Sequence, residues 1–189
     1  MEKALPNPIL FYWHDRRSDL WWYMSNFAYT PFMAEGILYL SSEQWLMAHK
    51  AALFGDSAMV EKMIKPQWTG PANIEQWSQS DFDRWTAMMN YVKMCGRKVA
   101  GFDKEIWAQH AISIMVEGLI FKFKTRPSLL QGLLSTGNNV LAEASEQDPI
   151  WGIGMWEKDY GTKYKQFNGT NWLGISLMTV RTLFHKKLL

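Results

Sequence analysis

The sequence predicts a mainly α-helical protein with a few short β-strands, an α+β fold. Several long segments repeat apolar residues at intervals of three and four, as one face of a helix does, and the longest spans 103–123. Side chains that favour helix N-termini, such as Ser41, Asp56 and Asp103, precede these segments. The runs of bulky and aromatic residues that suit strands are short and end at turn residues. These three observations favour packed helices over a large sheet.

The first half of the chain predicts strands that lead into helices. The pattern indicates a strand at 9–13, a second short strand at 20–23 and a hairpin around Glu35-Gly36 at 31–40. A helix that begins at Ser41 is expected over 41–55, followed by a shorter helix capped by Asp56 over 56–65. A loop or inserted element with proline and glycine breakers is expected over 66–79, and a further helix over 80–95.

The second half predicts two helices, a strand, two loops and a last helix. A basic connector with glycines comes first, and Pro127 suits the first turn of the shorter helix. His110 is expected to be a buried structural histidine. The expected spans are 96–102 for the connector, 103–123 and 127–134 for the helices, 140–145 for the strand, 146–154 for a rigid loop, 155–167 for a polar and aromatic excursion, and 173–187 for the last helix.

Composition is that of an ordinary soluble globular protein in a single domain. The 189 residues (22.0 kDa) are 48% hydrophobic and 20% charged. No apolar run approaches the roughly 20 residues of a membrane span, and the N-terminus does not resemble a signal peptide. Cys95, the single cysteine, excludes an internal disulfide, so a cytoplasmic location without membrane partners is expected. The net charge of +2 neither indicates nor excludes nucleic acid.

Two ionisable residues stand out on the helix that begins at Ser41. Glu43 and Lys50 share a face with apolar residues that should turn inward. Seven residues separate them, roughly 10 Å along the axis, which is too far for a direct helix pair but suits side chains that converge on a ligand. The structural alternative is a capping Glu43 and a Lys50 whose ammonium reaches solvent.

Other candidates lie in loops. Asp148 stands in the segment Glu146–Gly154, where acid, proline, tryptophan and glycine make a rigid, shaped loop. Asn26 either closes a turn or offers its amide to a ligand, and Arg97 suits a phosphate, although a solvated loop fits equally well. The sequence lacks a phosphate-binding glycine loop, a metal-spaced His/Cys cluster and a Gly-x-Ser-x-Gly elbow. Separated carboxylates and an amine suit glycosyl chemistry.

A set of short motifs occurs in a fixed order along the chain. The motifs are Ser25-Asn26-Phe27, Ser42-Glu43-Gln44-Trp45 with Lys50, Gly96-Arg97, Trp107, Lys122-Phe123, Leu133-Leu134-x-Thr136-Gly137, Glu143-Ala144-Ser145, Asp148-x-x-Trp151-Gly152 and Asn171-x-Leu173-Gly174-x-x-Leu177-Met178. This ordered set resembles the NADAR, or YbiA-like, family. The resemblance covers roughly 9–185, and the longer segment at about 66–90 and the excursion at about 155–167 depart from the family pattern, which leaves the substrate range open.

The resemblance implies a helical N-glycosidase that uses neither a metal nor an organic cofactor. It implies removal of ADP-ribose from guanine in nucleic acid, as an antitoxin or repair activity with a cognate ADP-ribosyltransferase toxin as partner, or hydrolysis of ribosylamino-pyrimidine phosphates of riboflavin synthesis. The oligomeric state stays open. The family's active-site positions map onto Glu43, Lys50, Trp107, Asp148 and Trp151, with Asn26, Phe27, Gly152 and Asn171 as supporting pocket residues and Arg97 as a substrate contact.

These residues lead to a hypothesis of mechanism. Lys50 attacks ribose C1 as a free amine, Glu43 carries protons, and Asp148 binds ribose hydroxyls or carries a second proton. A direct oxocarbenium route without a covalent lysine is the competing mechanism. A non-catalytic ADP-ribose or nucleotide-binding module is the competing function, and it leaves the joint presence of Glu43 and Lys50 unexplained.

Overall fold

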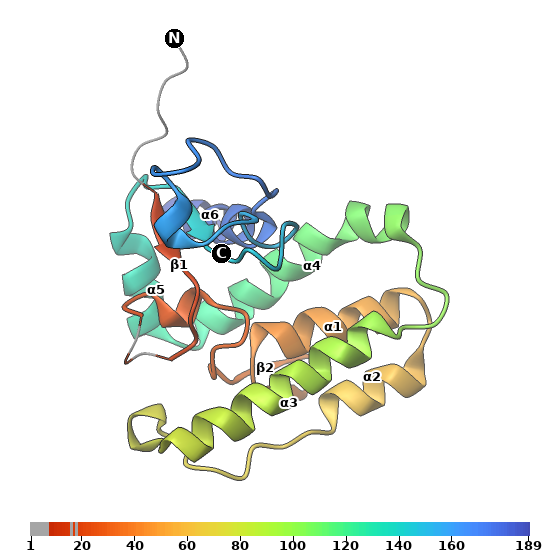
Figure 1. The fold of residues 1–189 in the computed structure, drawn as a ribbon. Helices are drawn as coiled ribbons and strands as arrows, with labels where there is room; N and C mark the ends of the chain where they lie inside the picture. The colour runs from red at the N-terminus through yellow and green to blue at the C-terminus, as the bar shows by residue number, and fades with distance from the viewer. Residues whose placement is uncertain (1–7, 16, 18) are drawn as a thin grey trace. The chain divides into compact units, whose positions relative to one another are not determined.

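The structure is a computed structural model that describes residues 8–15, 17 and 19–189. Helices dominate and each strand is three residues long, which confirms the predicted fold class (Figure 1). The chain folds into two compact units: a central unit, Asn26–Thr125, and a terminal unit made of the residues up to Ser25 and Arg126–Leu189. The single-domain organisation stays a prediction. Among the described residues, no helix combines the length and apolarity needed to cross a lipid bilayer.

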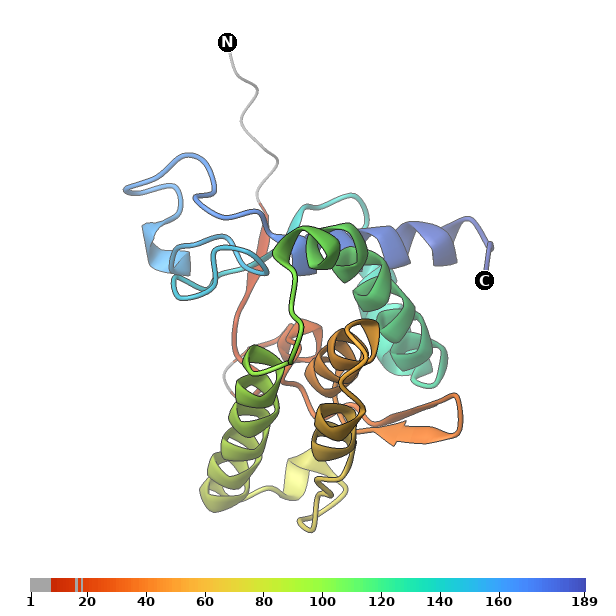
Figure 2. The same ribbon diagram turned by 90° about the vertical axis from the view of Figure 1, so that its right-hand side faces the viewer.

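The central unit consists of a hairpin followed by packed helices. Helix α1 packs against α2, α3 and α4, and α4 also packs against β2 (Figures 1 and 2). The elements are β2 (Phe32–Ala34), β3 (Ile37–Tyr39), α1 (Ser42–Leu53), α2 (Ser57–Ile64), the 3₁₀ helix η2 (Ile74–Gln76), α3 (Gln79–Arg97) and α4 (Lys104–Lys124).

Local sequence signals explain how α1 begins. Glu35 and Gly36 adopt positive φ angles of 53° and 79°, which a tight two-residue hairpin requires, so the predicted hairpin is confirmed. Ser41 caps α1 by accepting a hydrogen bond from Gln44 N at 3.1 Å. The Gln44 side chain accepts from Leu40 N at 2.7 Å rather than from the cap residue itself. Strand β3 is thereby tied directly to the first turn of α1.

Glycines allow the helices to approach α1 closely. A Cβ atom at Gly96 would lie 2.1 Å from Met47 Sδ, and one at Gly118 would lie 2.3 Å from Trp45 Cδ1. The prediction of a connector over 96–102 is therefore wrong at its start, because α3 continues through Arg97 and Gly96 is a buried contact residue. The helix continues because tertiary packing outweighs the low helix propensity of glycine.

The segment 66–79 is anchored to α3 rather than being an isolated excursion. The indole nitrogens of Trp68 and Trp77 both donate to Pro71 O, at 2.9 and 2.7 Å. Their rings pack together at 4.6 Å and contact Trp85 of α3 and Tyr29. Four aromatic rings thus hold this loop in place, which explains part of the high tryptophan content.

The terminal unit is built around two paired strands. Strands β1 and β4 run parallel, with Leu10 opposite Ala142, and α6 packs against both β4 and α5. The predicted short helix, strand and last helix are confirmed within a few residues. The elements are β1 (Ile9–Phe11), the 3₁₀ helix η1 (Trp22–Met24), α5 (Pro127–Ser135), β4 (Leu141–Glu143), the 3₁₀ helix η3 (Glu157–Asp159) and α6 (Trp172–His185).

Two local predictions are wrong. The residues 20–23 form a turn and the start of η1 instead of a strand, because the Asp19 carboxylate accepts hydrogen bonds from Trp21 N at 2.7 Å and Tyr12 N at 3.0 Å. These bonds bend the chain where strand pairing would need it extended. His110 is exposed on α4 and is not a core histidine.

Candidate functional site

The first turn of α1 carries a buried carboxylate. Glu43 is 3% exposed, and its backbone N–H donates to Asn26 O at 3.0 Å. The helix N-terminus favours the anionic form of such a side chain. The predicted inward orientation of the Glu43 face is confirmed, since Leu46 and Met47 on the same face are also buried.

Asn26 presents an unused acceptor beside this turn. Its side chain is 6% exposed, and no donor among the described residues reaches its Oδ1 atom. A buried amide oxygen without a hydrogen bond costs about 1–3 kcal/mol, so this atom is available to a ligand or to water. The neighbouring Phe27 accepts a hydrogen bond from Trp85 Nε1 at 2.7 Å, which fixes the Asn26-Phe27 segment against α3.

Lys50 lies in the last turn of α1 among aromatic rings. Its Nζ atom is 4.0 Å from the centre of the Phe102 ring and 5.5 Å from the Trp107 ring. Burial lowers the pKa of Lys50 from its ordinary value of 10.5, the Glu43 carboxylate opposes that shift, and the Arg97 guanidinium adds to it. The structure thus brings Glu43, Lys50, Arg97 and Trp107 into one electrostatic environment, with Phe102 in contact.

Sequence reasoning assigned no role in the site to two residues of this neighbourhood, although Lys122 is part of a family motif. Phe102, 45% exposed, lies next to the amine, and its position in a loop gives no periodic signal. Lys122 is fully buried on α4, and its Nζ donates to Ser42 Oγ at 3.3 Å, one residue before Glu43. Lys122 lies four residues after Gly118, which is on the apolar face of the predicted helix. This spacing was a signal that could have predicted a buried Lys122.

In the terminal unit, Asp148 shapes the loop after β4. Its Oδ1 atom accepts hydrogen bonds from Trp151 N at 2.9 Å and Ile150 N at 3.3 Å, and its backbone oxygen accepts from Gly152 N at 2.9 Å. Trp151 is half-buried and packs edge-on against Trp172 at 5.7 Å. These hydrogen bonds fold the loop back on Asp148, and two of them are accepted by its carboxylate.

Gly152 and Asn171 connect this loop to its neighbours. A Cβ atom at Gly152 would lie 2.8 Å from Asp148 O and 2.9 Å from Glu143 O, so only glycine fits. Asn171 adopts a left-handed conformation with φ of 54°, and its amide donates to Leu141 O at 2.9 Å and accepts from Glu143 N at 3.3 Å. These two residues support the loop through its backbone.

The described residues contain no group of three or more histidine, cysteine, aspartate or glutamate side chains placed to hold a metal ion. The chemistry that the central unit itself offers is therefore a buried carboxylate, an amine with a lowered pKa, an exposed guanidinium and aromatic walls.

Three known proteins are similar in sequence to this chain, two of them over most of its length. N-glycosidase R617 of Acanthamoeba polyphaga mimivirus is 34% identical over 161 residues, which cover 85% of this chain and 83% of that protein. Protein irg-1 of Caenorhabditis elegans is 30% identical over 143 residues, 74% of this chain and 58% of that protein. The chloroplastic riboflavin biosynthesis protein PYRR of Zea mays is 37% identical over 76 residues, 40% of this chain and only 11% of that protein.

A solved structure also matches the fold. The NMR structure of the E. coli protein YbiA has a TM-score of 0.66 and 25% sequence identity, over 99% of this chain and 92% of that one. The family model described as the NADAR domain matches residues 11–185, in agreement with the motifs noted in the sequence. The chain therefore belongs to the NADAR domain family.

Proposed function

We propose that the chain is an N-glycosidase that hydrolyses the bond between ribose C1 and an exocyclic amine of a base. The observation that carries this proposal is the Lys50 amine, whose pKa is lowered by burial, held near aromatic rings on the same helix face as the buried Glu43. A lysine in this state is a nucleophile towards carbonyl and iminium carbons. The mimivirus relative is itself named an N-glycosidase, which supports the reaction class.

The proposed reaction uses both side chains. Protonated Glu43 gives its proton to the ring oxygen as the ribose ring opens to an iminium at C1, and the neutral Lys50 amine adds to C1 to form an aminal. Glu43 then carries a proton from the added Lys50 nitrogen to the base amine, so that the C1–N bond to the base breaks and a Lys50–C1 Schiff base remains. Water adds to this Schiff base, the Lys50 amine leaves as the sugar aldehyde forms, and the proton released from the water returns to Glu43, so that one water is consumed and the free sugar, as ADP-ribose or ribose phosphate, is released.

As the specific substrate, we propose guanine in nucleic acid that carries ADP-ribose. The exposed Arg97 lies at the C-terminal end of α3 and is near enough to Lys50 to affect its pKa. A guanidinium beside the reactive amine suits the diphosphate of ADP-ribose. A cognate toxin and a cytoplasmic location stay predictions.

A second candidate substrate is a ribosylamino-pyrimidine phosphate of riboflavin synthesis. The observation that favours it is the match of 76 residues to the riboflavin biosynthesis protein PYRR of Zea mays. The same amine and carboxylate would act on this substrate, because it also joins ribose C1 to an exocyclic amine. The two candidates therefore differ in specificity and share one mechanism.

Mass spectrometry of a guanine-ADP-ribosylated single-stranded oligonucleotide tests the proposal. Wild type and the control Lys98→Ala should remove the ADP-ribose mass, while Lys50→Ala and Glu43→Gln should lose about 10²–10⁴ in rate. Borohydride added during turnover should reduce the Schiff base and leave an adduct on Lys50. Cleavage without an adduct would favour the direct oxocarbenium route.

If wild type leaves the modified oligonucleotide intact, ribosylamino-pyrimidine phosphates are tested next as substrates. If wild type binds ADP-ribose but releases base from neither substrate, the protein is a binding module and the enzymatic proposal is wrong. An unaltered rate in Glu43→Gln would remove Glu43 from the mechanism.

A further inference from the structure

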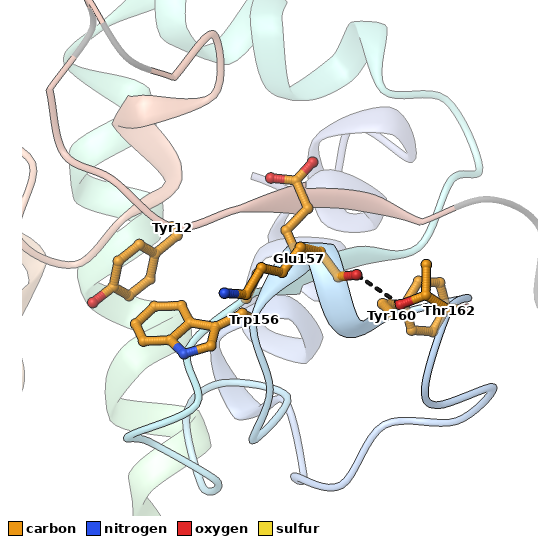
Figure 3. Close-up of a pocket in the computed structure, with 7 residues that line it drawn as sticks. Tyr12, Trp156, Glu157, Tyr160 and Thr162 are labelled. Atoms are coloured by element: carbon orange, nitrogen blue, oxygen red, sulfur yellow. Dashed lines mark hydrogen bonds between the residues drawn. The ribbon is translucent and has the colours of Figure 1, made fainter.

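A hollow lies entirely within the terminal unit, and no residue of the candidate site lines it. Figure 3 shows it between Tyr12, which follows β1, and the segment around η3. Its volume is about 750 Å³. The lining residues are Tyr12, Ala144, Trp156, Glu157, Lys158, Tyr160 and Thr162.

Aromatic rings dominate one end of this hollow. Tyr12 and Trp156 meet edge to face, with ring centres 5.0 Å apart and planes at 88° (Figure 3). Tyr12 also stacks on Trp13, with ring centres 5.3 Å apart and planes only 6° apart. Trp13 is nevertheless 46% exposed. An open indole stacked on a second ring is a surface on which another flat ring can stack.

A smaller hollow of about 520 Å³ continues this surface. Tyr12 and Glu157 line both hollows, and Trp13 and Trp21 line the second one. Four aromatic side chains, Tyr12, Trp13, Trp21 and Trp156, therefore line two hollows that share residues, and we call the two together the aromatic groove.

The groove also has polar groups and a fixed wall. Glu157 and Lys158 are both exposed, which places an acceptor and a cation at the lining. Thr162 Oγ1 donates to Lys158 O at 2.7 Å, and Lys163 pairs with Asp159 at 2.8 Å. Tyr160 packs on Phe167 at 5.3 Å. These contacts hold the segment 156–167 in shape, so the groove is preorganised.

We propose that the aromatic groove binds unpaired bases of a single-stranded nucleic acid. An aliphatic ligand would leave the ring faces poorly matched, whereas bases stack on them, Glu157 accepts from an exocyclic amine, and Lys158 meets a phosphate. One wall of the groove, Trp156 to Thr162, lies in the excursion 155–167, whereas Tyr12, Trp13 and Trp21 come from the N-terminal part of the chain. As a contact for nucleotides that flank a modified guanine, the groove rests on the proposed function.

Equilibrium binding tests the groove without any catalysis. The probe is an unmodified, fluorescein-labelled DNA strand of about ten nucleotides, within the usual size of such sites, with fluorescence anisotropy as readout. Trp13→Ala removes the most exposed ring and should weaken binding about 5- to 50-fold, as loss of one stacked base does. The control is Tyr164→Ala. This change removes an exposed ring of the segment 156–167 that does not line the groove.

Trp156→Leu provides a second variant, with circular dichroism to show that each variant is folded. Unchanged affinity in both folded variants, or equal binding of duplex DNA, whose base faces are already stacked, would overturn the proposal.

Kinetics then separate this inference from the proposed function. Trp13→Ala should raise KM for the modified oligonucleotide by the same 5- to 50-fold and leave KM for free ADP-ribosyl-guanosine unchanged. Equal KM effects on both substrates would contradict a role in strand binding. If wild type cleaves neither substrate, the proposed function fails, while the anisotropy result still decides whether the groove binds bases.

Discussion

At the scale of single residues, the reactivity of the candidate site depends on the balance of charges around Lys50. Burial and Arg97 lower the pKa of Lys50, and Glu43 opposes them. A lysine must lose its proton to act as a nucleophile, so this balance sets the lower pH limit of activity. The arrangement is informative because each contribution can be removed separately.

Arg97→Gln should move the low-pH limb of the kcat/KM profile to higher pH. Loss of the guanidinium removes a cause that lowers the Lys50 pKa, so less free amine is present at a given pH. Lys98→Gln, which removes the neighbouring exposed cation, should leave the limb in place. A drop by one constant factor at every pH would instead show that Arg97 only binds phosphate.

Asn26 should contribute to binding and not to stability. Because its Oδ1 atom accepts no hydrogen bond from the described residues, Asn26→Leu removes an unpaired buried oxygen and should raise the free energy of unfolding by about 1–3 kcal/mol. KM should rise about tenfold, the value of one lost hydrogen bond to substrate. Urea denaturation and steady-state kinetics measure both.

Asn171→Leu is the contrasting variant for that experiment. Its amide makes two hydrogen bonds in a left-handed conformation, so this change should destabilise the protein by more than about 2 kcal/mol. Equal stability losses in the two variants would show that Asn26 is a structural residue.

At the scale of elements, the contact between α1 and α4 depends on one glycine. Gly118→Ala should destabilise the protein by about 1–3 kcal/mol, because the new methyl group would overlap the fully buried Trp45 indole. An alanine at an unhindered helix position would instead stabilise by up to about 1 kcal/mol. The measurement is thermal unfolding of Gly118→Ala, compared with that of Ser113→Ala at an exposed site on α4. A stabilised Gly118→Ala would contradict the packing.

Two variants at Asp148 distinguish its contribution to the loop after β4 from a contribution of its charge to catalysis. Asp148→Asn keeps the acceptor for Trp151 N, so the melting temperature should stay near that of wild type. If Asp148 carries a proton, kcat should still fall about 100-fold. Asp148→Ala should in addition lose about 1 kcal/mol of stability with the lost turn contact. Retained kcat in Asp148→Asn would make Asp148 a loop-shaping residue only.

Elements were predicted best where the signal was local. Caps such as Ser41, Asp56 and Asp103 and the Glu35-Gly36 turn act over four residues or fewer, and the structure shows each as expected. Predictions failed where tertiary contacts decide. The Gly96 prediction was wrong because Met47 fills the space that a side chain would occupy. Periodicity cannot reveal which distant residue lies opposite.

The candidate site shows the same division. Glu43 and Lys50 share a helix, so their common face followed from spacing alone. Phe102 contacts Lys50 from a loop about fifty residues away in sequence, and only the fold brings it there. The roles of Asp148, Trp151 and Asn171 came from family motifs, and the terminal unit shows the backbone contacts through which these residues shape their loop.

At the scale of the whole molecule, stability should fall on mild acidification. His14 is 6% exposed, and burial lowers its pKa from 6.5 to about 4, although the adjacent Asp15 opposes the shift. Between these values the unfolded chain binds a proton that the folded chain does not, so the free energy of unfolding decreases as the pH falls. The loss reaches about 3 kcal/mol at pH 4 and is absent above pH 6.5, since each pKa unit corresponds to about 1.4 kcal/mol.

Urea denaturation between pH 4 and pH 7 measures this slope. His14→Gln removes the titrating group and should flatten the His14 part of the profile, so that variant and wild type differ most in pH dependence between pH 4 and pH 6.5. His110→Gln, at an exposed position on α4, should keep the wild-type slope. If His14→Gln and wild type have parallel profiles, other groups cause the acid sensitivity. Activity assays at pH 5 must be corrected for this loss before a low-pH limb is assigned to Lys50.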